Sequence, residues 1–449
     1  MKTIVNQPKY VTAIDIGTTK IVALVGERDS HGRIRIVGLS KVPSLGVKRG
    51  AIQNIDEAVA SIQKAIEAVQ IKTGLMFGDV LVGIAGQHIR STLNRGYITR
   101  DNYDSEITKD EVDRLVKDMY KIPIEIGEEI IHVIPQSFIV DNEPGIRNPI
   151  GMAGRRLEGN FHIVIGKTAT ALNIQKCVGR VGLNVKGLIL EQLASAHAVL
   201  SEDEKEAGVA IVDIGGGTTD LAVYYDNVVR HTAVIPFGGD VVTTDIKEGC
   251  TILHREAEEL KINFGSALGD MAPDGFVTIP GINGRESKEI AVNKLSYIIQ
   301  ARMEEIIDII LHEIEKSGYY EKLGAGIVVT GGGAMLKHLP QLIKFRTGLD
   351  VKIGYPTENL SAENEIDTNH PIFSTSVGLI LKGFEMASTE VETKKKTEYI
   401  RKAPVPEIEE FKEIPDETKT KAPNKLFDSL KKTFTTGITT MFDEKDSKM

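Results

Sequence analysis

The sequence predicts an α/β protein whose fold is built twice, as two similar halves that face a common cleft. The phrases AIDIGTTKIVAL, at residues 13–24, and AIVDIGGGTTDLAV, at 210–223, share one order: apolar strand, aspartate, glycine turn, two threonines, apolar strand. From residue 10 to about 384, strand-like apolar runs alternate with longer helical patterns, which is typical of α/β layering. A third glycine turn, GIVVTGGGAML, follows at 326–336. The repeated phrase therefore indicates a duplicated fold.

Composition and charge exclude several classes of protein. The chain has 449 residues, enough for two or more domains of ~100–200 residues each. Its net charge of −9 argues against a nucleic-acid-binding protein, because such proteins usually carry a basic excess. Cys177 and Cys250 form no CxxC pair, so neither a disulfide framework nor a zinc site is expected. Without a signal-peptide apolar region or a run of ~18 apolar residues, most of the chain is expected to be soluble and cytoplasmic.

The first half is expected to open with three strands, followed by a helix and a fourth strand. In the helix, Ile62, Ile66 and Val69 recur at three- and four-residue spacing and so share one face. The predicted elements cover residues 11–16, 21–25, 34–42, 55–71 and 80–85.

An inserted module is expected at residues 86–161. The pattern predicts a strand at 89–98, a helix at 109–120 and a strand at 130–140, followed by a loop rich in proline and glycine. The main alternation of strands and helices is expected to resume at 161–166.

The second half is expected to begin from a helix at 191–200, which leads into the second copy of the phrase, and to contain a long helix at 293–316. Residues 385–424 are rich in charged residues and proline and poor in apolar ones, so we expect a disordered linker there. The last stretch, KLFDSLKKTFTTGITTMF at 425–442, has a helical pattern of its own.

The two glycine turns have the chemistry of a phosphate cradle. Glycine lets backbone N–H groups come close to an anion, and threonine hydroxyls and a lysine add further donors. The first turn is Gly17, Thr18, Thr19 and Lys20, and the second is Gly215, Gly216, Gly217, Thr218 and Thr219. Asp15 and Asp213 precede the turns and supply the oxygen ligands that Mg²⁺ prefers. Either turn alone is usually just a hairpin, but together they predict one triphosphate site between the halves.

These motifs resemble the first phosphate, second phosphate and adenosine motifs of the actin-like ATPase superfamily. The resemblance covers roughly residues 10–384 and implies an actin-like (ribonuclease H-like) duplicated fold that binds ATP with Mg²⁺. It assigns Gly331, Gly332 and Gly333 to the adenosine loop, and Glu258 and Lys261 to contacts with the ribose and base. It also makes Glu191 the candidate for orienting the attacking water in a slow hydrolysis, although Gln192 replaces the proline that often follows.

The position of the insertion points to one family within the superfamily. The interval 43–79 leaves no room for the actin-type subdomain, whereas the module at 86–161 is similar to the small subdomain of the FtsA family of bacterial cell-division ATPases. The phrases LVGIAGQHIRSTLNRGYI and AEELKINFGSA are also similar to that family. The domains implied are two interleaved halves, the insertion, a second small subdomain, a linker and a terminal helix, at 1–85, 86–161, 162–194, 195–236, 237–310, 311–384, 385–424 and 425–442.

The terminal segment predicts a helix that lies on a membrane. Its apolar residues recur every four positions and its lysines make the other side basic, which suits the surface of an anionic bilayer. The apolar stripe is Leu426, Leu430, Phe434, Ile438 and Phe442, with Phe427 and Met441 beside it, and the lysines include Lys431 and Lys432. A helix that folds back on its own domain, or docks in a partner's groove, is the alternative.

The resemblance implies a protein that polymerises, anchors filaments of the tubulin-like protein FtsZ to the cytoplasmic face of the cell membrane at the division site, and recruits later division proteins through 86–161. It implies that the C-terminal tail of FtsZ docks near 237–310, that anionic lipids hold the terminal helix, and that no nucleic acid binds. The alternatives are another actin-superfamily ATPase, a small-molecule kinase, or a pilus-assembly scaffold of similar fold.

Overall fold

The computed structural model describes residues 9–29, 31–101, 104–281, 283, 286–361 and 366–402. The chain separates into two compact units, Met1–Lys395 and Lys396–Met449. The description below concerns the first unit, except for the end of the last helix, which crosses the boundary between the units. The predicted membrane helix, residues 425–442, lies outside the described residues.

Two five-stranded sheets have the same topology, which confirms the predicted duplication. The first has the order β11-β6-β1-β2-β3 and the second the order β18-β17-β12-β13-β14. In each, the first strand pairs antiparallel with the next strand of the chain and parallel with a strand that comes much later. The strands are β1 (Tyr10–Ile16), β2 (Lys20–Arg28), β3 (Ile34–Pro43), β6 (Asp79–Ile84), β11 (Asn184–Leu190), β12 (Val209–Ile214), β13 (Thr219–Tyr225), β14 (Val228–Ile235), β17 (Ile327–Thr330) and β18 (Val351–Ile353).

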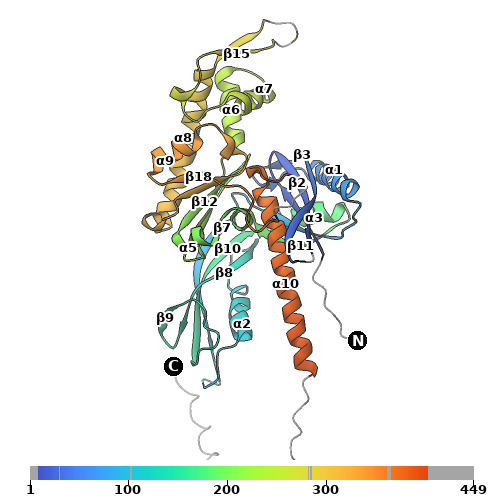
Figure 1. Ribbon diagram of the computed structural model, residues 1–449, viewed down its shortest axis with the longest axis vertical. Coiled ribbons are helices and arrows are strands. Elements are labelled where there is room, and N and C mark those ends of the chain that lie inside the picture. Colours follow the sequence, from blue (N-terminus) through green and yellow to red (C-terminus); the bar gives the residue numbers. More distant parts are fainter. Residues whose placement is uncertain are drawn as a thin grey trace, which may run out of the picture. The chain divides into compact units, whose positions relative to one another are not determined.

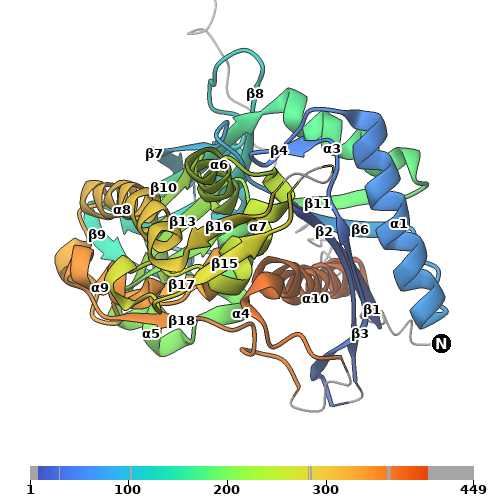
Figure 2. The same cartoon turned by 90° about the horizontal axis from the view of Figure 1, so that it is seen from above.

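Helices cover both faces of the first sheet. The helix α1 (Ile55–Thr73) packs on one face together with α3 (Thr168–Arg180), and α10 (Ser374–Lys402) packs on the other, as Figure 2 shows. The Asn54 side chain caps the start of α1 by accepting two backbone N–H groups, and Gly74 ends the helix in the left-handed conformation. Apolar side chains buried on both faces explain why the strands of this sheet are almost wholly apolar.

The second sheet carries most of the other helices. The longest, α8 (Val292–Lys316), buries a stripe of leucine, isoleucine and methionine against the second core. Around it lie α6 (Gly239–Cys250), α7 (His254–Phe264), α9 (Leu339–Thr347) and the ribbon of β15 (Phe276–Ile279) and β16 (Lys288–Ala291). The short helices α4 (Glu191–Val199) and α5 (Glu202–Ala207) connect the two halves.

The insertion is a four-stranded antiparallel sheet of the order β7-β10-β8-β9, with α2 (Lys109–Met119) packed against it (Figure 1). Its strands are β7 (Arg90–Thr99), β8 (Glu128–Val140), β9 (Glu143–Ile146) and β10 (Arg156–Lys167). Because β10 pairs with β7 and β8 throughout, the boundary expected at residue 161 falls inside a paired strand. The insertion also touches the second half, since Gln136 donates to the Val229 carbonyl at 2.6 Å and His162 bonds Thr232 at 2.9 Å.

The last helix corrects one prediction. Residues 385–402 continue α10, so the linker predicted to start at 385 is wrong for this stretch. The stretch contains alanine, methionine, glutamate and lysine, which favour helices, and it has no proline before Pro404. Residues 403–424 of the predicted linker lie outside the described residues. Among the helices that the structure describes, none has the length and the apolar run needed to cross a membrane.

The helices α4 and α10 cross at a glycine. A Cβ atom added at Gly378 of α10 would lie well inside van der Waals contact with the carbonyl oxygen of Ala194 in α4. Glycine at this position therefore sets the distance between the two helices.

We predict that Gly378→Ala destabilises the protein by at least ~2 kcal/mol, because the added methyl group meets backbone that cannot move aside. Urea unfolding followed by circular dichroism measures the effect. The matched control is Gly179→Ala in α3, where a Cβ meets no atom within 4 Å and should stabilise the helix by ~0.5–1 kcal/mol. Equal stability changes in the two variants would contradict the tight crossing.

Candidate functional site

A cavity between the halves brings together most of the residues that the glycine motifs predicted. It is lined by the first turn, the second turn, Glu191 and the start of the third turn. The predicted residues that line it are Asp15, Gly17, Thr18, Thr19, Lys20, Glu191, Asp213, Gly215, Gly216, Gly217, Thr218, Gly331 and Gly332. Residues far apart in the sequence thus converge because both turns lie at equivalent ends of the two duplicated sheets.

The two turns are built by the same hydrogen bond. The N–H of Gly17 donates to the carbonyl of Lys20 at 3.1 Å, and the N–H of Gly215 donates to that of Thr218 at 2.9 Å. The second turn has further support from the start of α6, since the N–H of Gly239 donates to the Gly215 carbonyl at 2.9 Å. The N–H of Asp240 adds a second such bond, to the Gly216 carbonyl at 2.8 Å, whereas the first turn accepts one, from the N–H of Ser44 to the Thr19 carbonyl at 3.2 Å.

The turns also contact each other across the cleft. Cβ atoms added at Gly216 and Gly217 would overlap the side chains of Thr19 and Thr18, respectively. The N–H of Gly50, at the tip of a small hairpin, donates to the Thr18 hydroxyl at 3.3 Å. The cavity that remains measures about 50 Å³, far below the ~300 Å³ at which ligand pockets usually begin. A triphosphate would therefore have to separate the turns.

Four carboxyl groups, three of them on buried residues and the fourth on the half-buried Glu191, line this cavity together with Lys20. Burial and the neighbouring Asp213 raise the pKa of Asp15 to about 6, although Lys20 opposes the shift. Burial, reinforced by Asp15, Asp220 and Asp213, raises the pKa of Glu191 well above its usual range. Burial also raises the pKa of Asp213. This surplus of acids is chemically suited to a cation.

The carboxyl groups do not form a direct metal site on their own. Within the described part of the chain, no three acidic, histidine or cysteine side chains converge closely enough to hold an ion. Mg²⁺ keeps several of its waters in protein sites. Asp15 and Asp213 are the residues that would hold a magnesium ion through water, and this role stays a prediction.

Asp220 was missed by the sequence analysis. It lines the cavity, burial and then Asp213 raise its pKa to about 8, and its Oδ1 atom has no partner among the described residues. Its other oxygen accepts the Thr218 hydroxyl at 3.0 Å, and in the ladder it lies opposite Asp213. The available signal was a charged residue at the start of an otherwise apolar strand.

Four predicted residues do not line the cavity. The Thr219 hydroxyl donates to the Phe237 carbonyl at 2.8 Å and supports the backbone, while Gly333 packs against Ile214. Lys261 pairs with Glu258 at 2.6 Å and donates to the Gly239 carbonyl at 2.9 Å. Through Gly239 this pair borders the second turn, so its predicted contact with the ribose and base stays a prediction.

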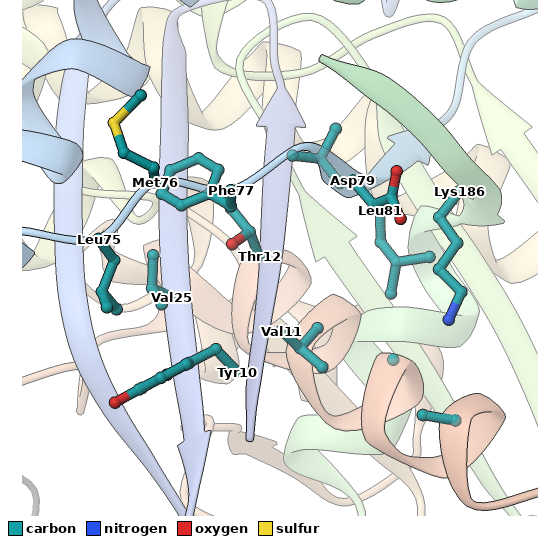
Figure 3. A pocket seen from close by; sticks show the side chains of 13 residues that line it. Tyr10, Val11, Thr12, Val25, Leu75, Met76, Phe77, Asp79, Leu81 and Lys186 are labelled. Carbon is teal, nitrogen blue, oxygen red and sulfur yellow. The ribbon is translucent and has the colours of Figure 1, made fainter. Parts of the chain in front are cut away.

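A larger cavity, of about 310 Å³, lies elsewhere on the first half (Figure 3). It opens where the parallel strands β1 and β6 diverge, because they pair only at Ala13–Leu81 and Ile14–Val82. Its walls are mostly apolar, including Leu75, Phe77 and Met76. It contains none of the predicted site residues, so its size alone does not make it the functional site.

Comparison with known proteins identifies relatives over most of the chain. A family model described as "Cell division protein FtsA" matches residues 210–378, and one described as "SHS2 domain inserted in FTSA" matches 86–165. The cell division protein FtsA of Pseudomonas aeruginosa is 38% identical over 86% of this chain and 91% of the relative. That of Escherichia coli strain K12 is 34% identical over 84% of this chain and 91% of the relative.

Solved structures share the fold at lower identity. A type IV pilus biogenesis complex of PilM and PilN gives a TM-score of 0.61 at 14% identity and covers 84% of this chain and 99% of that chain. MreB5 of Spiroplasma citri bound to ADP gives a TM-score of 0.50 at 14% identity, covering 88% of this chain and 100% of its own. These likenesses establish the actin-like fold.

We predict that Asp220→Asn flattens the pH dependence of stability. The pKa of Asp220 is about 8 in the folded protein, against ~3.9 in an unfolded chain, so the folded state binds the proton more tightly. The free energy of unfolding should then fall as the pH rises from about 4 to about 8, by up to ~1.4 kcal/mol per pH unit from this carboxyl. The amide removes that dependence and still accepts the Thr218 hydroxyl.

Urea unfolding at about pH 5, 7 and 9 measures this dependence. The control is Glu67→Gln, which neutralises an exposed carboxyl on α1 and should keep the wild-type slope. A wild-type slope in Asp220→Asn as well would contradict the assignment.

Proposed function

Because the chain belongs to the FtsA family of cell division proteins, we propose that it is an ATP-binding, actin-like protein that polymerises and anchors FtsZ filaments to the cytoplasmic face of the membrane. The observation that carries the nucleotide part is the pair of glycine turns facing each other across a cavity lined by carboxyl groups. The alternatives of a small-molecule kinase or a pilus-assembly scaffold have no comparable support, since the relatives that match most of the chain are FtsA proteins.

In this proposal the phosphates lie between the turns. The N–H group of Gly216 and the ammonium group of Lys20 are suited to a phosphate chain, and Gly331 and Gly332 border the adenosine side. Magnesium would neutralise phosphate charge beside Asp15 and Asp213.

Hydrolysis in this geometry should be slow. Glu191 begins α4, and its side chain packs against Gly83. A Cβ atom added at Gly83 would lie 3.0 Å from the Cγ atom of Glu191. Its raised pKa means that the carboxyl tends to keep its proton, and a protonated carboxyl cannot accept one from water. We therefore assign Glu191 the role of orienting water and not that of a strong base.

Nucleotide binding would also bias the relation between the halves. Since the turns touch in this structure, a bound triphosphate favours a more open arrangement and shifts the population toward it. We propose that this shift controls the surfaces through which copies of the chain form filaments.

The small subdomain of the second half, near 237–310, is the proposed dock for the FtsZ tail. Its exposed apolar side chains support this choice, with Ile262 on α7 and Phe276 on β15 exposed by 68% and 71%. Later division proteins are proposed to bind the insertion, residues 86–161. The terminal segment 425–442 is proposed to hold anionic lipids at the division site.

The nucleotide site predicts that Lys20→Ala weakens ATP binding by about tenfold or more, because an ammonium group that lines the cavity beside the phosphates is lost. Calorimetric titration of the full chain with ATP and Mg²⁺ measures the affinity. Lys64→Ala, on the exposed face of α1, is the control and should bind like the wild type. Unchanged affinity in Lys20→Ala would place the nucleotide elsewhere.

The membrane proposal predicts that a chain ending at Pro423 loses co-sedimentation with vesicles of anionic lipid, since the apolar stripe and its lysines are gone. Full-length chain carrying Phe434→Glu should lose most of it too, and neutral vesicles should bind less of the wild type. Equal pelleting of the shortened and complete chains would exclude the segment as the anchor.

A further inference from the structure

Two hydroxyl groups from different helices bond the same oxygen of Asp213. The Ser195 hydroxyl of α4 donates to Asp213 Oδ2 at 2.6 Å, and the Thr375 hydroxyl of α10 donates to it at 3.1 Å. The two hydroxyl oxygens lie 3.0 Å apart. Asp213 itself comes from the end of β12 in the second half, so this cluster joins three elements.

All three side chains are buried, which makes the bonds strong and their loss costly. Ser195 is fully buried, and Thr375 and Asp213 are each 8% exposed. Hydrogen bonds from hydroxyl groups to a carboxylate are shorter and stronger than bonds between neutral groups. Because water cannot replace the donors at such depth, the carboxylate depends on these two residues for its orientation.

The orientation matters because the two oxygens of Asp213 have different surroundings. Oδ2 is occupied by the hydroxyls, whereas Oδ1 lies against Gly331, where any Cβ would overlap it. A half-turn of the carboxylate would only exchange two equivalent oxygens, whereas a tilt out of its present plane would break both hydrogen bonds. The hydroxyl pair therefore permits one orientation at the wall of the cavity.

The equivalent acid of the first half has no such support. The hydrogen bonds that the structure describes include none to the Asp15 carboxylate, whose charged neighbours are Lys20 and Asp213. Ser195 lies one helical turn after Glu191, so the two share a face of α4, with Glu191 at the cavity and Ser195 behind it. Of the two predicted metal carboxylates, only Asp213 thus accepts hydrogen bonds that the structure describes, from Ser195 behind it and from Thr375 at the cavity wall.

We propose that Ser195 and Thr375 are positioning residues, which hold the Asp213 carboxylate in the orientation that a magnesium–nucleotide complex requires. This inference rests on the proposed nucleotide function and assigns two residues that no glycine motif contains. Because they lie on α4 and α10, which cross between the halves (Figure 2), the orientation of Asp213 depends on the relative position of these helices.

The start of α10 supplies matched controls, because three consecutive residues carry hydroxyl groups with three different partners. Ser374 bonds Thr330 on β17 at 2.6 Å, Thr375 bonds Asp213, and Ser376 donates to the Phe373 carbonyl at 3.1 Å. Ser374 and Ser376 are fully buried. Of these three, only the Thr375 hydroxyl reaches the Asp213 carboxylate. A substitution of Ser374 therefore shows the effect of a general loss of packing in which the positioning of Asp213 is kept.

The experiment measures ATP affinity of the full chain by calorimetry, first with a metal chelator and then over a series of Mg²⁺ concentrations. For Ser195→Ala and Thr375→Val, the Mg²⁺ concentration that gives half of the maximal gain in ATP affinity should rise by about tenfold. Their affinity for ATP without Mg²⁺ should stay within about twofold of the wild type. Thr375→Ser keeps the hydroxyl and should show the Mg²⁺ dependence of the wild type. Ser374→Ala should show it as well.

Wild-type Mg²⁺ dependence in folded Thr375→Val and Ser195→Ala would overturn the inference while leaving the proposed function intact. An equal loss in Ser374→Ala would also overturn it, because the effect would then be structural. If Ser195→Ala does not fold, the comparison of Thr375→Val with Thr375→Ser decides the question alone. A wild-type chain that binds no ATP with Mg²⁺ would instead refute the proposed function itself.

Discussion

The buried carboxyl groups between the two glycine turns are the constraint on which the rest of the cleft depends. Asp15, Glu191, Asp213 and Asp220 lie at one cavity with a single ammonium group, that of Lys20. Charges removed from water are stable only when other groups pair with them or donate hydrogen bonds to them. The backbone N–H groups of the turns, the buried hydroxyls and a bound cation are the groups that can do so. The same groups therefore stabilise the close approach of the halves and determine the chemistry of the site.

The two halves have the same topology, but different hydrogen bonds hold their glycine turns in place. Both halves use the same sheet order and the same turn hydrogen bond, yet only the second turn is braced by the start of α6 and by hydroxyls behind its aspartate. The first turn carries Lys20 and accepts hydrogen bonds from the N–H group of Ser44 and from that of Gly50 at a hairpin tip. A rigid wall facing a more adaptable one is suited to a cleft that has to open for its ligand, because only one side needs to adjust.

The insertion and α10 connect this cleft to surfaces outside it. The insertion is covalently part of the first half, but its β8 and β10 are hydrogen-bonded to β14 of the second. When the halves separate, these contacts must therefore either be strained or move together with the second half. The same holds for α10, which starts at the cleft and packs along the first sheet. Both elements can transmit a change at the proposed nucleotide site because each is held at two places.

The sequence by itself determined the duplicated fold, the two turns and their aspartates, since these are local patterns that short stretches specify. It also located α1 and α8, but it placed a disordered linker at residues 385–402, where α10 continues, because charge was taken as a sign of disorder. Asp220 had one local signal, its charge in an apolar strand, but Ser195 and Thr375 had none and meet from positions 180 residues apart. Only the tertiary structure decides such contacts, because burial and hydrogen bonding to a distant carboxylate depend on how the two halves pack, and no spacing along the chain encodes that.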